Sequence, residues 1–251
     1  MIAFYALIFI FGLVLGSFFN VCIHRIPKKE SISFPPSHCP KCDSNLRALD
    51  LIPVASFLYL RGKCRYCAMP VSWRYPIVEF LTGILFLFSA WSVGFELALA
   101  KYLFIVSLFI VISFIDLEHY LIPNSIIIFG FAVGIGLNIW VQDVTFLDSL
   151  LGFLAGGGLL LLLAVVSKGG MGGGDIKLAA LIGFLLGWPK VLLGLFLGAF
   201  IAAIIGITLI LAGFTKRREP IPFGPFIAIG TLLALFFGDS LIAWYLSYFG
   251  L

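Results

Sequence analysis

Long runs of apolar residues alternate with short polar segments along most of this chain. An α-helix needs about 20 such residues to cross a hydrocarbon core of roughly 30 Å. Eight runs approach this length, at residues 2–22, 77–95, 102–115, 124–141, 147–167, 176–187, 191–214 and 226–248. The third and sixth runs are short and stand beside charged residues, so we expect a thinned or water-penetrated membrane next to them. The pattern predicts an all-α polytopic membrane protein with about eight transmembrane helices.

Composition excludes the main alternative classes. Of the 251 residues, 62% are hydrophobic and 11% are charged, whereas a soluble domain carries roughly 25% charged residues. The net charge of +4 rests on 16 basic and 12 acidic residues. Because the basic residues are not spread along a helical face, we expect no nucleic-acid partner. The lipid bilayer is the expected environment of most of the chain.

The positions of the basic residues predict the orientation in the membrane. Nine of the 16 lie between the first two apolar runs, and two, Lys101 and Lys190, fall on the opposite side. The other five lie on the same side as the nine, in loops or at the start of a run, and they are Lys168, Lys177, Lys216, Arg217 and Arg218. Cytosolic loops are enriched in Lys and Arg, so we expect this side in the cytosol and both termini outside. A polar segment without a small-residue cleavage site follows the first run, which we expect to be a retained anchor and not a signal peptide.

Four of the five cysteines lie in the polar loop at 24–76, as two CxxC pairs. This spacing is typical of paired knuckles that hold one zinc ion with four thiolates, here Cys39, Cys42, Cys64 and Cys67. The alternative is two disulfides or four unrelated thiols, and a reducing cytosol disfavours the disulfides. Four sulfur ligands leave no open coordination position, so the zinc would be structural.

The expected parts are a first helix at 1–23, a zinc-stabilised cytosolic loop at 24–76 and a helical membrane domain at 77–251. We expect the fifth cysteine, Cys22, to be a buried small apolar residue.

Two aspartates stand at the membrane edge, where ionisable groups are costly and often mark a functional site. Asp116 ends the third run and Asp175 opens the sixth, so the predicted topology places both at the cytosolic edge, where they could face each other. Two nearby carboxylates share one proton and titrate as a pair. The ionised member can accept a proton from water while the protonated member polarises a scissile carbonyl group. The arrangement favours an aspartyl protease.

Glycines precede Asp175 in the run 169–174. They would let a substrate backbone approach closely and would allow turns with positive φ, while Asp175 at a helix start would meet the positive end of the helix dipole. Less specific interpretations remain open: a solvated boundary residue at 116, a helix cap at 175, a hinge or a tight helix contact for the glycines, and metal ligation by Glu118 and His119. A phosphate loop is excluded because the Walker spacing and a preceding strand are missing. The competing function is a transporter whose intramembrane acids carry protons or metal ions.

Several short motifs occur in order over nearly the whole chain, from about residue 12 to 230. Besides the two CxxC pairs, they are GSFFNV at 16–21, HRIP at 24–27, YPIVE at 75–79, DLEHYLIP at 116–123, GGGDIK at 172–177 and PFGPF at 222–226. With these motifs the chain resembles the bacterial prepilin peptidases, or type IV leader peptidases, which are integral-membrane aspartyl proteases of the GxGD type. Asn124 departs from the family pattern, in which many members carry aspartate, but neither of the paired aspartates is affected.

The resemblance implies catalytic roles for Asp116 and Asp175. It implies as substrates the prepilins of type IV pili and the pseudopilins of type II secretion, cut after a glycine that ends a short basic leader. The implied location is the bacterial inner membrane, with the active site of this multi-pass protein facing the cytosol. Family members are often bifunctional and also methylate the new amino terminus with S-adenosylmethionine, an activity associated with the cysteine-bearing loop. The turn at 216–225 would lie near the site, and its three prolines prevent it from being helical throughout.

Four further residues are candidates for substrate binding or methyl transfer: Glu79, Arg25, Lys177 and Gly174. Glu79 could pair with an amine or a cationic sulfonium, or could simply stabilise the amino terminus of a helix. Arg25 and Lys177 could bind substrate or lipid phosphates, or could serve only as topological anchors. Asn20 could form a hydrogen bond between helices. The pattern does not predict an oligomeric state.

Overall fold

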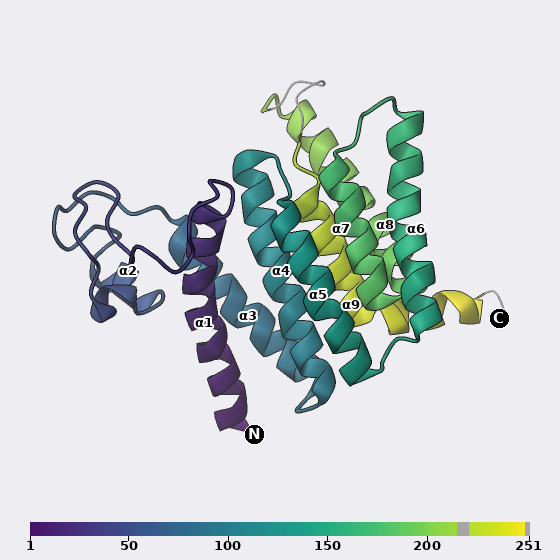
Figure 1. The fold of residues 1–251 in the computed structure, drawn as a ribbon, viewed down its shortest axis with the longest axis horizontal. Helices are drawn as coiled ribbons and strands as arrows, with labels where there is room; N and C mark the ends of the chain where they lie inside the picture. The colour runs from purple at the N-terminus through teal and green to yellow at the C-terminus, as the bar shows by residue number, and fades with distance from the viewer. Residues whose placement is uncertain (215–220, 249–251) are drawn as a thin grey trace. The chain divides into compact units, whose positions relative to one another are not determined.

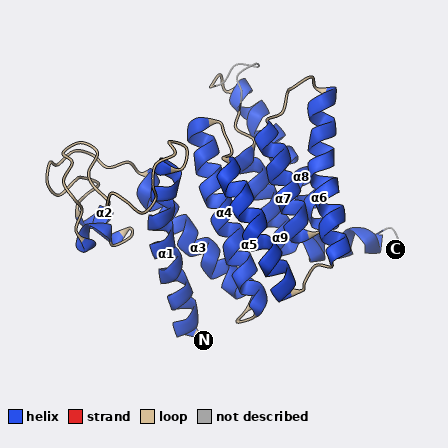
Figure 2. Ribbon diagram, viewed as in Figure 1, coloured by secondary structure: helices blue, strands red, loops and turns tan. Residues whose placement is uncertain are grey.

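The computed structural model describes residues 1–214 and 221–248, and this part of the chain forms nine α-helices and one 3-10 helix without a β-strand (Figure 2). The elements are α1 (Ile2–Arg25), η1 (Ala48–Leu51), α2 (Ala55–Tyr59), α3 (Arg74–Val93), α4 (Leu97–His119), α5 (Asn124–Val141), α6 (Phe146–Val166), α7 (Gly173–Leu186), α8 (Trp188–Leu211) and α9 (Gly224–Tyr248). Seven of them, all except η1, α2 and α7, are long and apolar enough to cross a membrane. The predicted class of all-α membrane protein is confirmed.

Of the two helices expected to be short, one is long and the other is indeed short. The third apolar run belongs to α4, which has 23 residues and continues to His119, so the prediction of a short third helix is wrong. The run underestimates the helix because charged side chains in a last turn can reach the headgroup region, which lies outside the hydrocarbon core. In contrast, α7 has only 14 residues, which is about 21 Å at 1.5 Å per residue. The eight predicted spans are therefore seven long helices and one short one.

The chain divides into two compact units, Met1–Val111 and Ile112–Leu251. In the first unit, α1 packs against α3 at two glycines. A Cβ atom on Gly12 would lie 2.8 Å from a Cα atom of α3, and one on Gly16 would lie 2.7 Å from another. Only residues without a side chain allow two helix backbones to approach so closely.

Two predictions about single side chains of α1 are confirmed. The Asn20 side-chain amide donates a hydrogen bond of 3.1 Å to the backbone carbonyl of Tyr75 in α3. Cys22 is a buried residue of the same helix. Both positions therefore support the packing of α1 within the first unit.

In the second unit, α6 packs along α7 and α8 packs along α9, again at glycines (Figure 1). Gly152 of α6 lies directly against the backbone of Gly183 in α7, and Gly230 of α9 lies against the backbone of Gly198 in α8. The Asn138 side chain of α5 donates a 2.8 Å hydrogen bond to a backbone carbonyl of α7. Helices on two sides therefore hold the short α7 in place, and its amino-terminal end carries one of the two aspartates.

Candidate active site

The carboxyl end of α4 positions Asp116. This residue lies one turn before the end of the helix, and only 5% of it is exposed. The N–H group of Tyr120 donates a 2.9 Å hydrogen bond to the carbonyl oxygen of Asp116, and Tyr120 itself has a left-handed backbone (φ 54°), as is common at helix ends. The chain then turns through Pro123 into α5. The Asp116 carboxyl group consequently lies beside a turn at the end of the helix.

The amino end of α9 meets Asp116. The N–H group of Gly224 donates a 2.9 Å hydrogen bond to Oδ2 of Asp116, and a Cβ atom on Gly224 would lie 2.7 Å from the same oxygen. N–H groups in the first turn of a helix have no partner inside that helix, so they are available to a carboxylate. Sequence reasoning noted the motif at 222–226 but missed this role of Gly224. Pro225 is the signal that could have found it, because proline favours the first positions of a helix.

The first turn of α7 positions Asp175, as predicted. Gly172 is the N-cap residue of this helix. A Cβ atom on Gly172 would lie 3.0 Å from Oδ2 of Asp175, so the carboxyl group folds back over the helix start, where the helix dipole is positive. Asp175 is half-buried. The Asp175 carboxyl group feels the negative charge of Asp116 electrostatically. Such an interaction weakens with distance, so the two carboxyl groups lie near each other.

The glycines before Asp175 serve mainly for close packing. Among the glycines at 169–174, only Gly169 has a positive φ, of +92°. The turns with positive φ that the sequence predicted for this run therefore occur at one position. A Cβ atom on Gly174 would lie 2.9 Å from the Cβ atom of Ile122, in the connection between α4 and α5, whereas one on Gly173 would meet nothing within 4 Å. Gly174 therefore allows α7 to touch the segment that follows Asp116.

Lys177 provides a second link at this place. Its Nζ atom donates a 2.9 Å hydrogen bond to Oδ1 of Asn124, the first residue of α5. Of the residues singled out from the sequence, Asp116, Asp175, Gly174 and Lys177 thus come together where the α4–α5 connection meets the amino ends of α7 and α9. All of these contacts lie within the second unit.

Glu79 and Arg25 belong to the first unit and hold its loop. Glu79 is 8% exposed, and its Oε2 atom accepts a 2.7 Å hydrogen bond from the backbone N–H of Val54, a residue that sequence reasoning did not single out. The guanidinium group of Arg25, also buried, donates hydrogen bonds to the carbonyl oxygens of Ser31 (2.9 Å) and Pro35 (2.7 Å). Both charged groups therefore bind the backbone of the loop between α1 and α3.

The four loop cysteines form a cluster that could hold a metal ion. The Sγ atoms of Cys39, Cys42, Cys64 and Cys67 all lie within 4.8 Å of one another. The Sγ atoms of Cys39 and Cys67 are 3.9 Å apart, close to the separation of about 3.8 Å that follows from tetrahedral geometry and a Zn–S distance of about 2.3 Å. The two knuckles share one backbone pattern, since Cys39 N–H donates to Ser44 (3.0 Å) and Cys64 N–H to Met69 (2.8 Å). The donor set and its spacing fit a tetrahedral metal site.

Local hydrogen bonds adjust the thiols of this cluster. Hydrogen bonds with the side chain and backbone of Ser44 lower the pKa of Cys42 to about 6, and backbone hydrogen bonds of Cys67 and Tyr66 lower the pKa of Cys64. At Cys67 the hydrogen bond with the Met69 backbone acts in the same direction, but desolvation and the neighbouring thiols outweigh it and raise the pKa to about 11. The lowered values favour thiolates, the form of cysteine that binds a metal.

The basic residues Lys216, Arg217 and Arg218, with the start of the turn at 216–225, lie outside the residues that the structure describes. The described part of that turn, from residue 221, leads into the amino end of α9 beside Asp116.

Fold and site together define a polytopic α-helical membrane protein with two carboxyl groups gathered at a junction of helix ends. The chain belongs to the type IV leader peptidase family, whose model matches residues 103–207, and a model of the bacterial peptidase A24 N-terminal domain matches residues 10–93. It is a multi-pass bacterial membrane protein. No solved structure gives a significant match.

Three curated relatives match over nearly their full length. A protein of Bacillus subtilis (strain 168) is 39% identical over 242 residues, which cover 96% of this chain and 98% of the relative. Relatives from Aeromonas hydrophila and Legionella pneumophila are each 35% identical, with coverage of 98% and 97% of this chain and 95% of each relative. All three are named prepilin leader peptidase/N-methyltransferase. The comparisons give no support to the alternative of a transporter.

Proposed function

We propose that this protein is a membrane aspartyl endopeptidase that removes the basic leader from type IV prepilins and from the pseudopilins of type II secretion. Cleavage follows the glycine that ends the leader, at the cytosolic face of the inner membrane. The same protein methylates the new amino terminus with S-adenosylmethionine. The observation that carries the peptidase proposal is the meeting of Asp116 and Asp175 at one junction of helix ends.

In the proposed reaction, Asp116 and Asp175 act as a pair that shares one proton. The ionised carboxyl group accepts a proton from water, and the protonated one polarises the carbonyl group of the scissile bond and then assists the leaving amine. The apparent pKa values belong to the pair, so neither residue alone is assigned as the acid or the base. The Gly224 N–H group orients the Asp116 carboxyl group through its 2.9 Å hydrogen bond.

Gly174 and Lys177 have supporting roles in this proposal. Gly174 allows α7 to contact Ile122, and the bond from Lys177 to Asn124 joins the starts of α7 and α5. Both contacts set the position of Asp175 relative to the segment that follows Asp116. The exposed Lys177 ammonium group also remains available to a carbonyl group of the substrate or to a lipid phosphate.

Methylation is assigned to the first unit in this proposal, with Glu79 as the residue that faces the amine or the sulfonium group. A buried carboxylate attracts a cation more strongly than one in bulk water, which fits either group. Glu79 already binds the Val54 N–H group and is hydrogen-bonded to Ser17, so it stands where α1, α3 and the loop meet. When bound, S-adenosylmethionine supplies the methyl group, and the part of Glu79 is to orient the amine. Arg25 holds the loop at 24–76 in place and does not itself bind substrate.

The metal of the loop is proposed to be structural zinc, held by Cys39, Cys42, Cys64 and Cys67. Four thiolates fill the tetrahedral positions, so the ion takes no part in catalysis and instead joins the two knuckles. A loop of this size without a core of its own gains its stability from such a site. We also infer the functional division into a first helix (1–23), the zinc loop (24–76) and the membrane domain (77–251), with the loop in the cytosol.

Cleavage of a model prepilin by the purified protein in detergent tests the peptidase proposal. Wild type should cut after the leader glycine, whereas Asp116→Asn and Asp175→Asn should each lose at least about 10² in rate, the lower range for acid–base catalysis. Glu118→Gln is the matched control, because it removes an exposed carboxyl group from the same helix end, and it should cut normally. The proposal fails if either aspartate variant keeps wild-type activity. Mass spectrometry of the product after addition of S-adenosylmethionine tests methylation.

A further inference from the structure

The loop of the first unit contains an apolar segment that none of the proposed activities uses. Residues 51–60 read LIPVASFLYL and contain no charged residue. None of these ten residues is buried, although the segment includes α2. Leu58 is 63% exposed and Tyr59 is 79% exposed. An uncharged stretch of about 10 to 14 residues is typical of a buried core helix or of an interfacial segment, and this one does not form a core.

One hydrogen bond fixes the depth of this segment relative to the membrane helices. Val54, directly before α2, donates its N–H group to Glu79 of α3 at 2.7 Å. Glu79 lies five residues inside α3, about 8 Å along its axis, and packs against Gly16 of α1. Gly16 lies nine residues before the end of α1, which is about 13 Å. The hydrogen bond therefore holds the segment alongside α1 and α3, at a level inside the ends of both helices.

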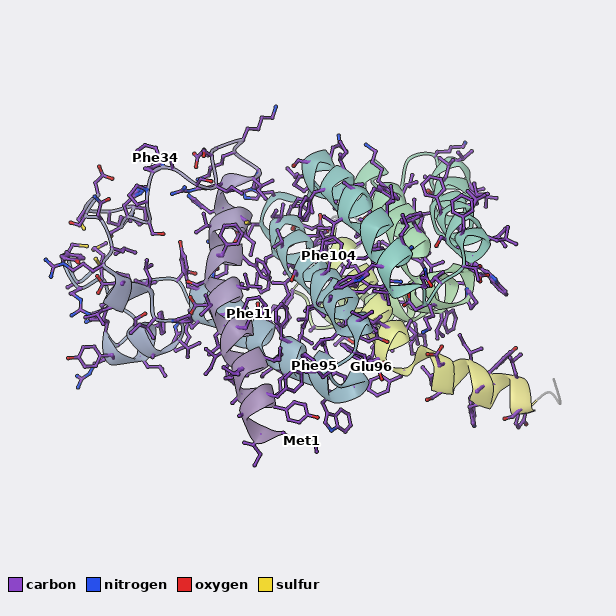
Figure 3. The ribbon with its side chains drawn as sticks, turned by 60° about the horizontal axis from the view of Figure 1, so that its bottom comes forward. Met1, Phe11, Phe34, Phe95, Glu96 and Phe104 are labelled. Carbon is purple, nitrogen blue, oxygen red and sulfur yellow. The ribbon has the colours of Figure 1, made fainter. Side chains whose placement is uncertain are left out.

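The figures agree with this placement within the first unit. In Figures 1 and 3 the α2 turn lies level with the middle of α1. Figure 3 shows Phe34, in the same loop, beyond the carboxyl end of α1, whereas Phe11 of α1 lies level with the α2 turn. The exposed side chains of α2 consequently lie at a depth where the neighbouring α1 also exposes apolar residues, such as Phe11 and Val14.

Several backbone polar groups of the segment are paired within the segment itself, as a lipid environment favours. The N–H groups of Ser56, Leu58 and Leu60 donate to backbone carbonyls of the segment at 2.9 to 3.0 Å. Such internal pairing is what a bilayer requires of a backbone. Just before the segment, Asp50 accepts hydrogen bonds from Arg65 and from the hydroxyl group of Tyr66. Burial acts to raise the pKa of Asp50, but these bonds outweigh it and lower the pKa, so its charge is compensated within the loop.

The residues around the segment are those found at a membrane surface. Phe57 of α2 stacks edge-on against Trp73 at a centroid distance of 4.8 Å, and Trp73 directly precedes the membrane helix α3 and is 67% exposed. Tryptophan and tyrosine are enriched at the headgroup level of bilayers. Arg61 and Lys63 follow the segment directly, which suits contact with the phosphates of anionic lipids.

From these observations we propose that residues 51–60 form an interfacial membrane anchor, inserted at the boundary of headgroups and hydrocarbon beside α1 and α3. The occupant of this surface is the lipid bilayer itself. Burying the exposed Leu58 and Tyr59 side chains in lipid supplies the driving force, and the Val54–Glu79 bond sets the depth. The anchor would hold the cysteine cluster close to the membrane surface. This inference rests on the first unit alone and does not depend on the proposed activities.

Photo-crosslinking of the full-length protein in vesicles of phosphatidylethanolamine and phosphatidylglycerol tests the anchor. A benzophenone amino acid is placed at position 58 or 59, with position 34 as the matched control in the same loop and position 14 as the lipid-facing reference. We expect lipid adducts at 58 and 59 to match those at 14 and to exceed those at 34 several-fold. Adduct yields at 58 and 59 as low as at 34 would overturn the proposal. So would replacement of the lipid adducts by peptide adducts when a prepilin is added, because the surface would then be a substrate site.

Hydroxyl-radical footprinting of the unmodified protein in the same vesicles gives an independent measurement. Tyr59 and Phe34 are aromatic residues of similar exposure, 79% and 74%. If lipid covers the α2 turn, oxidation of Tyr59 should be several-fold lower than that of Phe34 in vesicles. Equal oxidation of the two residues would place the segment in water and refute the anchor.

Discussion

At the scale of single residues, the site depends on glycines that stand beside carboxyl groups. Gly224 and Gly172 each leave room for an aspartate oxygen, at distances of 2.7 and 3.0 Å from where a Cβ atom would lie. Gly174 leaves room for Ile122. A methyl group at any of these positions forces a local shift, because well-packed interiors have no spare volume. Each glycine is therefore required by one particular neighbour.

Gly174→Ala should reduce the rate of prepilin cleavage strongly, because the new Cβ atom would lie 2.9 Å from Cβ of Ile122 and would displace the start of α7. A misplacement of about 1 Å can cost roughly 10²-fold in rate. The matched control is Gly173→Ala, where the added atom meets nothing within 4 Å and activity should stay near wild type. Steady-state cleavage assays of both variants would contradict the packing argument if the two lost activity equally.

Cys39→Ser should abolish metal binding, because it removes one of the four sulfur atoms that lie within 4.8 Å of one another. Elemental analysis of purified wild type should find about one zinc per chain, as expected for a Cys₄ site. Cys22→Ser changes the fifth cysteine, which lies in α1 outside the cluster, and it should keep the metal. Full zinc content in the Cys39 variant would refute the assignment of these ligands.

At the scale of elements, the second unit is assembled from helix pairs whose backbones touch at glycines. The pairs α6–α7 and α8–α9 make the closest approaches. Lipid tails are as apolar as the helix surfaces, so the hydrophobic effect gives little drive for association inside the membrane, and close van der Waals packing takes its place. Because α7 is short, its position depends on these contacts, and so does the position of Asp175.

Gly152→Leu should destabilise the second unit, since this position of α6 lies directly against the backbone of Gly183 in α7. Overpacking of a tight contact costs typically about 1 to 3 kcal/mol, which should appear as a lower midpoint of thermal unfolding in detergent. Gly158→Leu, on the same helix at a position that faces open space, is the control and should leave the midpoint nearly unchanged. An equal loss of stability in both variants would argue for a general effect of leucine on α6.

At the scale of the whole molecule, the two proposed activities are assigned to different units. Asp116 and Asp175 lie in the unit Ile112–Leu251, and Glu79 lies with the cysteine loop in the unit Met1–Val111. If each activity depends on its own unit, single substitutions should separate them. A variant that cannot cleave the precursor cannot methylate it either, because methylation needs the amine that cleavage produces.

Glu79→Gln should give a product that is cleaved but not methylated, because it removes the negative charge proposed to face the amine while keeping the shape of the side chain. Mass spectrometry of the product with S-adenosylmethionine present is the measurement. Asp175→Asn is the counterpart, and it should methylate a synthetic pre-cleaved pilin but not cut the precursor. Equal loss of both activities in the Glu79 variant would instead assign Glu79 a folding role through its bond to Val54.

The sequence by itself predicted the class of protein and the four cysteines that the structure gathers into one cluster, and it singled out the two aspartates that are proposed to be catalytic. Apolar runs predict membrane helices from local composition alone, and the CxxC spacing brings thiols together within each knuckle, so neither prediction needs distant contacts. The tertiary structure decided how far α4 extends, that α7 is short, and that a backbone N–H group of α9 binds Asp116 across more than 100 residues of chain. It also revealed which close neighbour each glycine accommodates, and that the Val54 N–H group donates a hydrogen bond to Glu79. These features depend on contacts between segments far apart in the chain, and local patterns of apolar and polar residues do not encode such contacts.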